Sequence, residues 1–146
     1  IILYYWYLNY IFFTQFKKIR LIKISLFLGF LSVFFLFLYL FFLGENNYYK
    51  YFRKIGIFIY ILFSITSELL LSIIYFKNSN KTFFNNHFIR FKLVLSIGLV
   101  SLGLILFPFM VMKIDNVANL RNITSWNYFL LIQFNFLFTF LIWKKK

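Results

Sequence analysis

The sequence predicts an all-α fold, a polytopic transmembrane helical bundle with about five spans. Of its 146 residues, 63% are hydrophobic and only 13% are charged, whereas a soluble domain is about half apolar and about a quarter charged. The apolar residues form long continuous runs, and polar, basic, Asn-rich segments separate these runs. Because the runs do not alternate between apolar and polar residues, they do not fit the strands of a membrane β-barrel.

Five runs are candidate spans of one membrane domain covering residues 1–146. A bilayer core takes about 20 apolar residues in a helix. The runs are 2–16, 24–43, 55–76, 93–112 and 126–143. The first is short and rich in Tyr and Trp, so it could cross a thinned bilayer or lie at the interface. Trp126 and Trp143 flank the fifth run, as interfacial anchors do.

The basic segments predict the orientation of the spans. Segments 17–23, 77–92 and 144–146 carry net charges of +4, +4 and +3 and fall on one side of a five-span protein. Segments 45–54 and 113–125 carry +2 and +1 and fall on the other side. The positive-inside rule places the C-terminus on the more basic side, which is the matrix in a mitochondrion. This role accounts for the net charge of +13, so we do not expect a nucleic-acid partner.

Residue usage indicates an AT-rich genome. Phe occurs 25 times and Tyr 11 times, whereas Pro and Ala occur once each. Helix packing in membranes favours small residues and gives no reason to replace Ala by Phe. Phe, Tyr, Ile, Lys and Asn, however, have AT-rich codons. We therefore expect a multi-pass protein of the mitochondrial inner membrane, encoded in the mitochondrial genome of a protist; an AT-rich bacterium or plastid is the rival source.

Glu68 is the one acidic residue within a predicted span. An ionisable group near the bilayer centre costs about 2.5–3.5 kcal/mol on insertion scales, so it is first interpreted as functional. Ser64 and Ser72 lie one helical turn before and after Glu68 on the same face, and Tyr75 falls close to that face. These four residues form a candidate proton path. The alternative is a protonated or paired Glu68 that only ties its helix to a neighbour.

Other chemistry has little support in the sequence. The chain has no Cys, which excludes disulfides and thiolate metal sites. It has no Gly-rich nucleotide loop, nucleophile–base set or metal-ligand cluster, so we expect no self-contained active site, no metal and no cofactor, but bound phospholipids. His87 is expected to be solvated or to face headgroups. Gly98 and Gly103 are expected to allow close helix contact, and Pro108 to kink the fourth span.

The stretch IGIFIYILFSITSELLLSIIYFKNSN, which contains Glu68, resembles the second membrane helix of chain 4L of NADH dehydrogenase. That family has a mid-helix Glu followed by Leu or Met and small polar residues. VLSIGLVSLGLILF resembles its third helix, with Gly103 at the family's Gly, and DNVANLRNI resembles its tail. The resemblance covers residues 24–123 and implies that Glu68 belongs to the proton-conducting axis that links ubiquinone reduction to the antiporter-like subunits.

This chain departs from the family at three points. The family's third helix carries a second Glu, and the matching position here is about Leu99. The first and fifth predicted spans have no counterpart in a three-helix protein. The family's first loop faces the matrix, whereas the charge pattern places residues 45–54 on the opposite side.

Three functional hypotheses follow. The first is a chain 4L-like core membrane subunit of complex I, with Glu68 in the proton-translocation path. The second is a subunit of another inner-membrane assembly, such as cytochrome oxidase, complex II or ATP synthase. The third is a structural adaptor that packs other subunits or lipids and moves no protons. In each case the expected partners are lipids and the other membrane subunits of a large respiratory complex.

Overall fold

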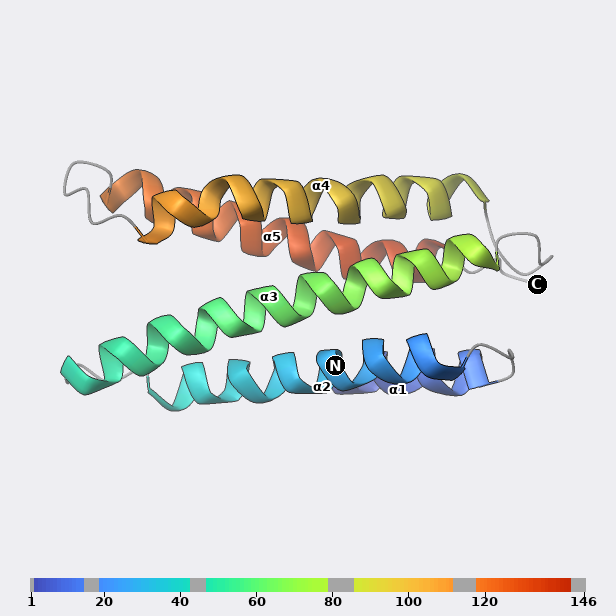
Figure 1. The fold of residues 1–146 in the computed structure, drawn as a ribbon, viewed down its shortest axis with the longest axis horizontal. Helices are drawn as coiled ribbons and strands as arrows, with labels where there is room; N and C mark the ends of the chain where they lie inside the picture. The colour runs from blue at the N-terminus through green and yellow to red at the C-terminus, as the bar shows by residue number, and fades with distance from the viewer. Residues whose placement is uncertain (1, 15–18, 43–46, 79–85, 112–117, 143–146) are drawn as a thin grey trace. The chain divides into compact units, whose positions relative to one another are not determined.

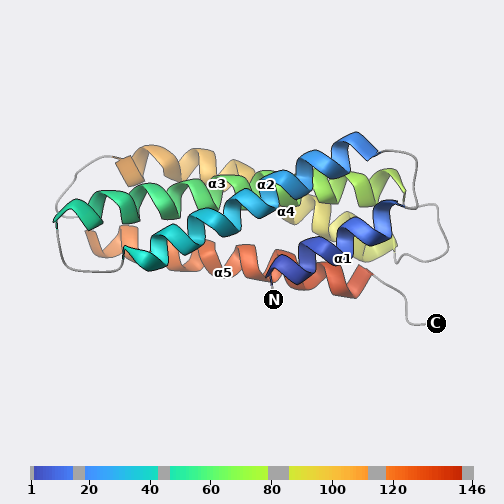
Figure 2. The same cartoon turned by 90° about the horizontal axis from the view of Figure 1, so that it is seen from below.

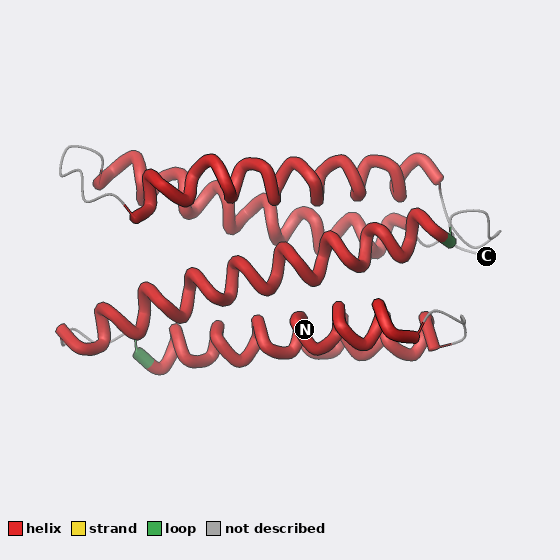
Figure 3. The backbone as a smooth tube through the Cα atoms, viewed as in Figure 1, coloured by secondary structure: helices red, strands yellow, loops and turns green. Residues whose placement is uncertain are grey.

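The computed structural model describes residues 2–14, 19–42, 47–78, 86–111 and 118–142. These residues are helical apart from the turn positions Phe42 and Asn78, and no strand occurs among them (Figure 3). The predicted all-α fold is therefore confirmed. The helices are α1 (Ile2–Thr14), α2 (Ile19–Phe41), α3 (Asn47–Lys77), α4 (Asn86–Val111) and α5 (Ala118–Ile142).

Three helical segments are long and apolar enough to cross a membrane. They are Arg20–Phe41, Ile55–Lys77 and Asn86–Ile105, and a shorter apolar segment runs from Trp126 to Ile142. The first helix, α1, has 13 residues, so it is about 20 Å long and shorter than a bilayer core of about 30 Å. The lengths and composition of these helices describe a multi-pass integral membrane protein.

Large apolar side chains cover the outer surface of the helices. On α2, Phe27, Phe34 and Phe41 are each more than half exposed. They are spaced seven residues apart and so form one stripe along the helix. A soluble protein rarely leaves such a continuous apolar surface uncovered, whereas lipid tails solvate it well.

The chain divides into two compact units, residues 1–74 and 75–146, with the boundary inside α3 after Ile74. In the first unit α2 runs antiparallel to α1, and α3 runs antiparallel to α2 (Figures 1 and 2). Two glycines allow these helices to approach. A Cβ on Gly29 of α2 would lie 2.5 Å from Cδ2 of Trp6 on α1. A Cβ on Gly56 of α3 would lie 3.3 Å from the backbone oxygen of Phe35 on α2.

The second unit contains the antiparallel pair α4 and α5 (Figure 1). Gly103 permits close contact here, as expected, because its Cβ would lie 2.6 Å from the hydroxyl oxygen of Tyr128. Gly98 differs from expectation, since no described atom of another helix lies within 4 Å of its Cβ position. The helix α4 continues past Pro108 to Val111, and the Pro108 side chain lies outside what the structure describes.

Several basic residues that the sequence places in loops belong to helices. Arg20 and Lys23 lie in α2, and Arg90 and Lys92 lie in α4. Lys and Arg are good helix formers, and their long apolar stems can extend along a helix near the membrane surface. The sequence predicts that Lys92 belongs to a basic segment between two spans. This prediction is wrong, because Lys92 lies in α4 and its side chain is 0% exposed.

Other charged groups are exposed or undescribed. His87 is exposed in the first turn of α4, where it has the surface position that the sequence predicts. Glu45, Asp115 and the C-terminal lysines 144–146 lie outside the described residues. The predicted orientation of the C-terminus therefore stays a prediction.

Candidate functional site

Glu68 lies on the inner face of α3 and is 1% exposed. Its carboxyl oxygen Oε1 accepts a hydrogen bond of 2.8 Å from the hydroxyl of Tyr5 on α1. Tyr5 is also buried, so the bond forms away from solvent. A buried polar group needs such a partner, because leaving it unsatisfied costs about 1–3 kcal/mol. The bond thus joins two helices through residues that are 63 positions apart in sequence.

Small hydroxyl side chains surround Glu68 on the same face of α3. Ser64, Ser67 and Ser72 are each fully buried. The Ser67 hydroxyl donates to the backbone oxygen of Ser64 at 2.9 Å, and the Ser72 hydroxyl donates to that of Glu68 at 2.8 Å. Bonds of this type satisfy hydroxyl groups within their own helix, so an apolar helix can carry them at low cost.

These small side chains also let α2 approach α3 closely. Ser25 on α2 is buried, and its hydroxyl donates to the backbone oxygen of Ser67 at 2.9 Å. Polar contacts between membrane helices stabilise their association by about 0.6 kcal/mol on average. The face that carries Glu68 is therefore the packing face of α3, held to α1 by Tyr5 and to α2 by Ser25.

The structure places three of the four predicted site residues together. Ser64, Glu68 and Ser72 share the buried face of α3 as expected. Ser64 Oγ has no hydrogen-bond partner among the described residues. The Ser72 hydroxyl donates its hydrogen to the backbone oxygen of Glu68. In a proton relay, this hydrogen would have to pass to another group. Tyr75 is buried, but it falls in the second unit, so its relation to Glu68 stays a prediction.

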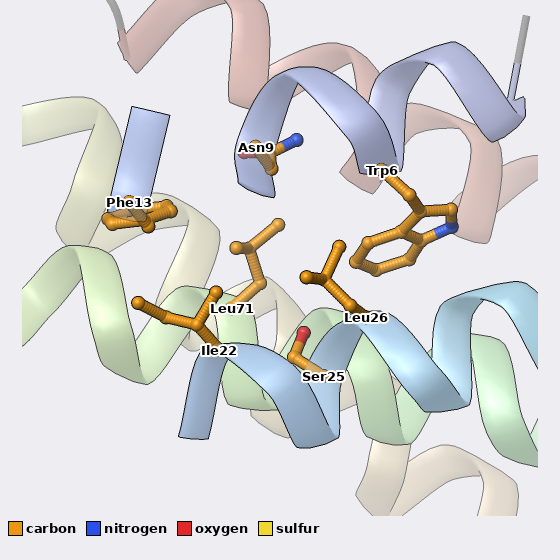
Figure 4. A pocket seen from close by; sticks show the side chains of 7 residues that line it. All are labelled: Trp6, Asn9, Phe13, Ile22, Ser25, Leu26 and Leu71. Carbon is orange, nitrogen blue, oxygen red and sulfur yellow. The ribbon is translucent and has the colours of Figure 1, made fainter. Parts of the chain in front are cut away.

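A shallow pocket lies beside this site between α1, α2 and α3 (Figure 4). Its lining residues are Trp6, Asn9, Phe13, Ile22, Ser25, Leu26 and Leu71. The two polar members are directed to the backbone: Asn9 donates to the oxygen of Tyr5 at 2.8 Å, and Ser25 to that of Ser67. The pocket leaves no room for a water molecule.

Reasoning from the sequence missed Tyr5. Its partner Glu68 is far away in the chain, and Tyr5 is one of 11 tyrosines, several of them in the same helix. Leu99, which the sequence resemblance aligns with a second Glu, is buried, and its backbone oxygen accepts a hydrogen bond from the hydroxyl of Tyr128.

Comparison with protein-family models, with curated proteins and with solved structures finds no match for this chain. Among the described residues, no group of three or more His, Cys, Asp or Glu side chains could hold a metal ion. The candidate site is therefore the buried carboxyl group of Glu68 in a multi-pass membrane protein, and the hydroxyl of Tyr5 is its hydrogen-bond donor.

Proposed function

We propose that this chain is a membrane subunit of a proton-translocating respiratory complex of the mitochondrial inner membrane, related to chain 4L of NADH dehydrogenase. In this proposal Glu68 binds and releases a proton. The observation that supports it is the full burial of a carboxyl group in the middle of an apolar helix. Because an ionisable residue at that depth costs about 2.5–3.5 kcal/mol on insertion scales, a functional role is the first interpretation.

The geometry suits a carboxyl group that changes its protonation state. The Tyr5 hydroxyl donates to Oε1 whether the carboxyl is ionised or neutral. The second oxygen, Oε2, is then the atom that can carry the proton. Tyr5 is therefore a positioning residue that holds Glu68 in one orientation. In this proposal, neighbouring subunits supply the other donors and acceptors of the path.

The alternative is a structural subunit of another inner-membrane assembly, in which Glu68 stays protonated. The observation that favours it is the set of interhelical bonds around Glu68. Tyr5 ties α1 to α3, and Ser25 ties α2 to α3. In that case the carboxyl group serves helix association alone.

Two measurements separate these functions. Isolating the native complex through a tagged copy of the chain identifies its neighbours, and co-purification with complex I membrane subunits is expected. Proton uptake and quinone reduction are then measured in vesicles that contain the Glu68→Gln complex. Gln keeps an oxygen acceptor for Tyr5 but cannot ionise, so we expect normal assembly with reduced coupling.

The control is Thr66→Val, because Thr66 is on the exposed side of α3 and its hydroxyl donates to the backbone oxygen of Leu62 in the same helix. Thr66→Val should leave coupling unchanged. Unchanged coupling in the Glu68→Gln complex would assign Glu68 to packing. Co-purification with haem-bearing subunits in place of complex I subunits would overturn the assignment to a chain 4L-like role.

A further inference from the structure

The exposed face of α2 carries two cations followed by phenylalanines. These residues are spaced alternately by three and four positions, so they lie on one side of the helix. They are Arg20, Lys23, Phe27, Phe30, Phe34, Phe37 and Phe41, and we call them the cation–phenylalanine stripe. Both cations lie at the start of the helix, and the rings continue from there to its end.

Every member of this stripe is exposed. The phenylalanine side chains are between 45% and 81% exposed, and Arg20 and Lys23 are exposed as well. Among the described residues of the first unit, Glu68 is the one acidic residue, and it is buried on α3. The described part of this unit therefore offers no exposed carboxylate to the two cations.

The buried face of α2 contacts its neighbours through small residues. Gly29 meets the indole ring of Trp6 on α1, and the Ser25 hydroxyl donates to the backbone oxygen of Ser67 on α3. Small side chains are what allow membrane helices to approach each other closely. The stripe contains none, because every apolar position in it is Phe. It therefore lacks the feature by which α2 binds other helices, whereas flexible acyl chains adapt to the spaces between bulky rings.

The first part of the stripe matches the depth of one lipid leaflet. The hydrocarbon core of a bilayer is about 30 Å thick, so one leaflet is about 15 Å deep. From Lys23 to Phe34 the helix rises by about 16 Å. A phospholipid with its phosphate at Arg20 and Lys23 thus extends its acyl chains along the first three rings. The last two rings, Phe37 and Phe41, lie at the depth of the other leaflet, where the stripe has no cation.

The charge of the stripe favours an anionic headgroup. Arg20 and Lys23 are about one helical turn apart on the same face, so both side chains can reach one phosphate. A guanidinium group binds phosphate oxygens through two parallel N–H bonds, and an ammonium group adds a compact charge. A zwitterionic headgroup brings its own cation, which these two residues repel. A headgroup with a net negative charge has no such group.

We propose that the cation–phenylalanine stripe binds one anionic phospholipid. Its phosphate lies at Arg20 and Lys23, and its acyl chains follow Phe27, Phe30 and Phe34. This site is on the exposed face of α2 and does not depend on the proposed role of Glu68.

The test is photo-crosslinking of lipid probes to the full chain in phosphatidylcholine nanodiscs. Two probes carry identical acyl chains with a diazirine group, and their headgroups are phosphatidylglycerol and phosphatidylcholine. Mass spectrometry of the digested chain locates the crosslinked residues. Each cation near the membrane surface strengthens the binding of an anionic lipid about fivefold, so the phosphatidylglycerol probe should label residues 27–34 about 25-fold more strongly. Labelling of Phe37 and Phe41 should be equal for the two probes.

The double variant Arg20→Gln, Lys23→Gln removes both charges. It should reduce labelling by the phosphatidylglycerol probe to the level of the phosphatidylcholine probe. The matched control is Lys77→Gln, Arg90→Gln, which removes two exposed charges from α3 and α4 and gives the same net charge. Its labelling of α2 should equal that of the wild type. Lys23→Gln alone, with an expected fivefold loss, serves if the double variant does not fold.

Three results would overturn the proposal. Equal labelling of residues 27–34 by both probes would show lipid contact without headgroup selection. A loss in the control variant as large as in the test variant would assign the preference to the overall charge of the chain. The absence of label along the whole stripe in the folded chain would show that another helix covers this face.

Discussion

Gly29 is the residue whose replacement most directly tests the packing of α1 on α2. A Cβ at this position would lie 2.5 Å from Cδ2 and 2.8 Å from Nε1 of Trp6, whose indole ring is 0% exposed. Carbon atoms in contact are normally about 3.5–4.0 Å apart, so Gly29→Ala requires the ring to withdraw by about 1 Å. Because the indole is rigid, α1 has to move with it.

The expected size of the effect follows from two opposing contributions. Inserting a methyl group into a packed contact costs about 1–3 kcal/mol. Ala is also a better helix former than Gly by up to about 1 kcal/mol. Gly98→Ala is the matched control, because no described atom of another helix lies within 4 Å of its Cβ position. The helix-propensity gain is common to both variants, so Gly29→Ala should be less stable than Gly98→Ala by the packing cost alone, about 1–3 kcal/mol.

The assay is reversible unfolding of the full chain in mixed detergent micelles, followed by tryptophan fluorescence. The free energy of unfolding should fall for Gly29→Ala and stay equal or rise for Gly98→Ala. Trp6→Leu should remove most of the difference, since the clash involves the indole ring. Equal stability of the two glycine variants would refute the packing of Trp6 against Gly29, and with it the approach of α1 that brings Tyr5 to Glu68.

Further predictions concern single contacts. Tyr5→Phe removes the donor to Glu68 and should lower the free energy of unfolding by about 1 kcal/mol, whereas Tyr4→Phe, at an exposed position, should not; detergent unfolding compares them. Gly103→Ala should displace the Tyr128 hydroxyl and cost about 1 kcal/mol, and the cost should vanish in a Tyr128→Phe background; a double-mutant cycle measures this. Phe34→Lys places a charge on the exposed face of α2 and should make the free energy of membrane insertion of that span less favourable by about 2.5–3.5 kcal/mol. Insertion into microsomal membranes measures this change. Insertion at the wild-type level would contradict a lipid-facing Phe34.

The helices and the residue on which the site depends could be predicted from the sequence because both produce local patterns. A run of about 20 apolar residues specifies a membrane helix by length alone. One carboxyl group within such a run is conspicuous, so Glu68 could be found without a structure. The shared face of Ser64, Glu68 and Ser72 follows from the helical period.

The partners of these residues could not be predicted, because they come from other helices. Tyr5 contacts Glu68 across 63 positions, and many other tyrosines are compatible with the same local pattern. Lys92 lies among basic residues at the edge of an apolar run. A surface lysine is expected at the same kind of position, so the sequence does not distinguish the two. Only the position of Asn135 and Thr139 on α5 distinguishes a buried lysine from an exposed one.

The bond between Tyr5 and Glu68 fixes the position of α1 along the length of α3. Glu68 lies about 20 Å from the start and about 14 Å from the end of the apolar segment Ile55–Lys77, far from either headgroup layer. The fifth residue of α1 therefore lies beside the middle of this segment of α3. A second contact is made by Trp6, whose ring packs against Gly29 of α2 where a Cβ atom is absent. Sliding α1 by one turn along its neighbours would break both the Tyr5–Glu68 bond and the contact of Trp6 with Gly29. These two contacts therefore hold this short helix at one level of the bundle.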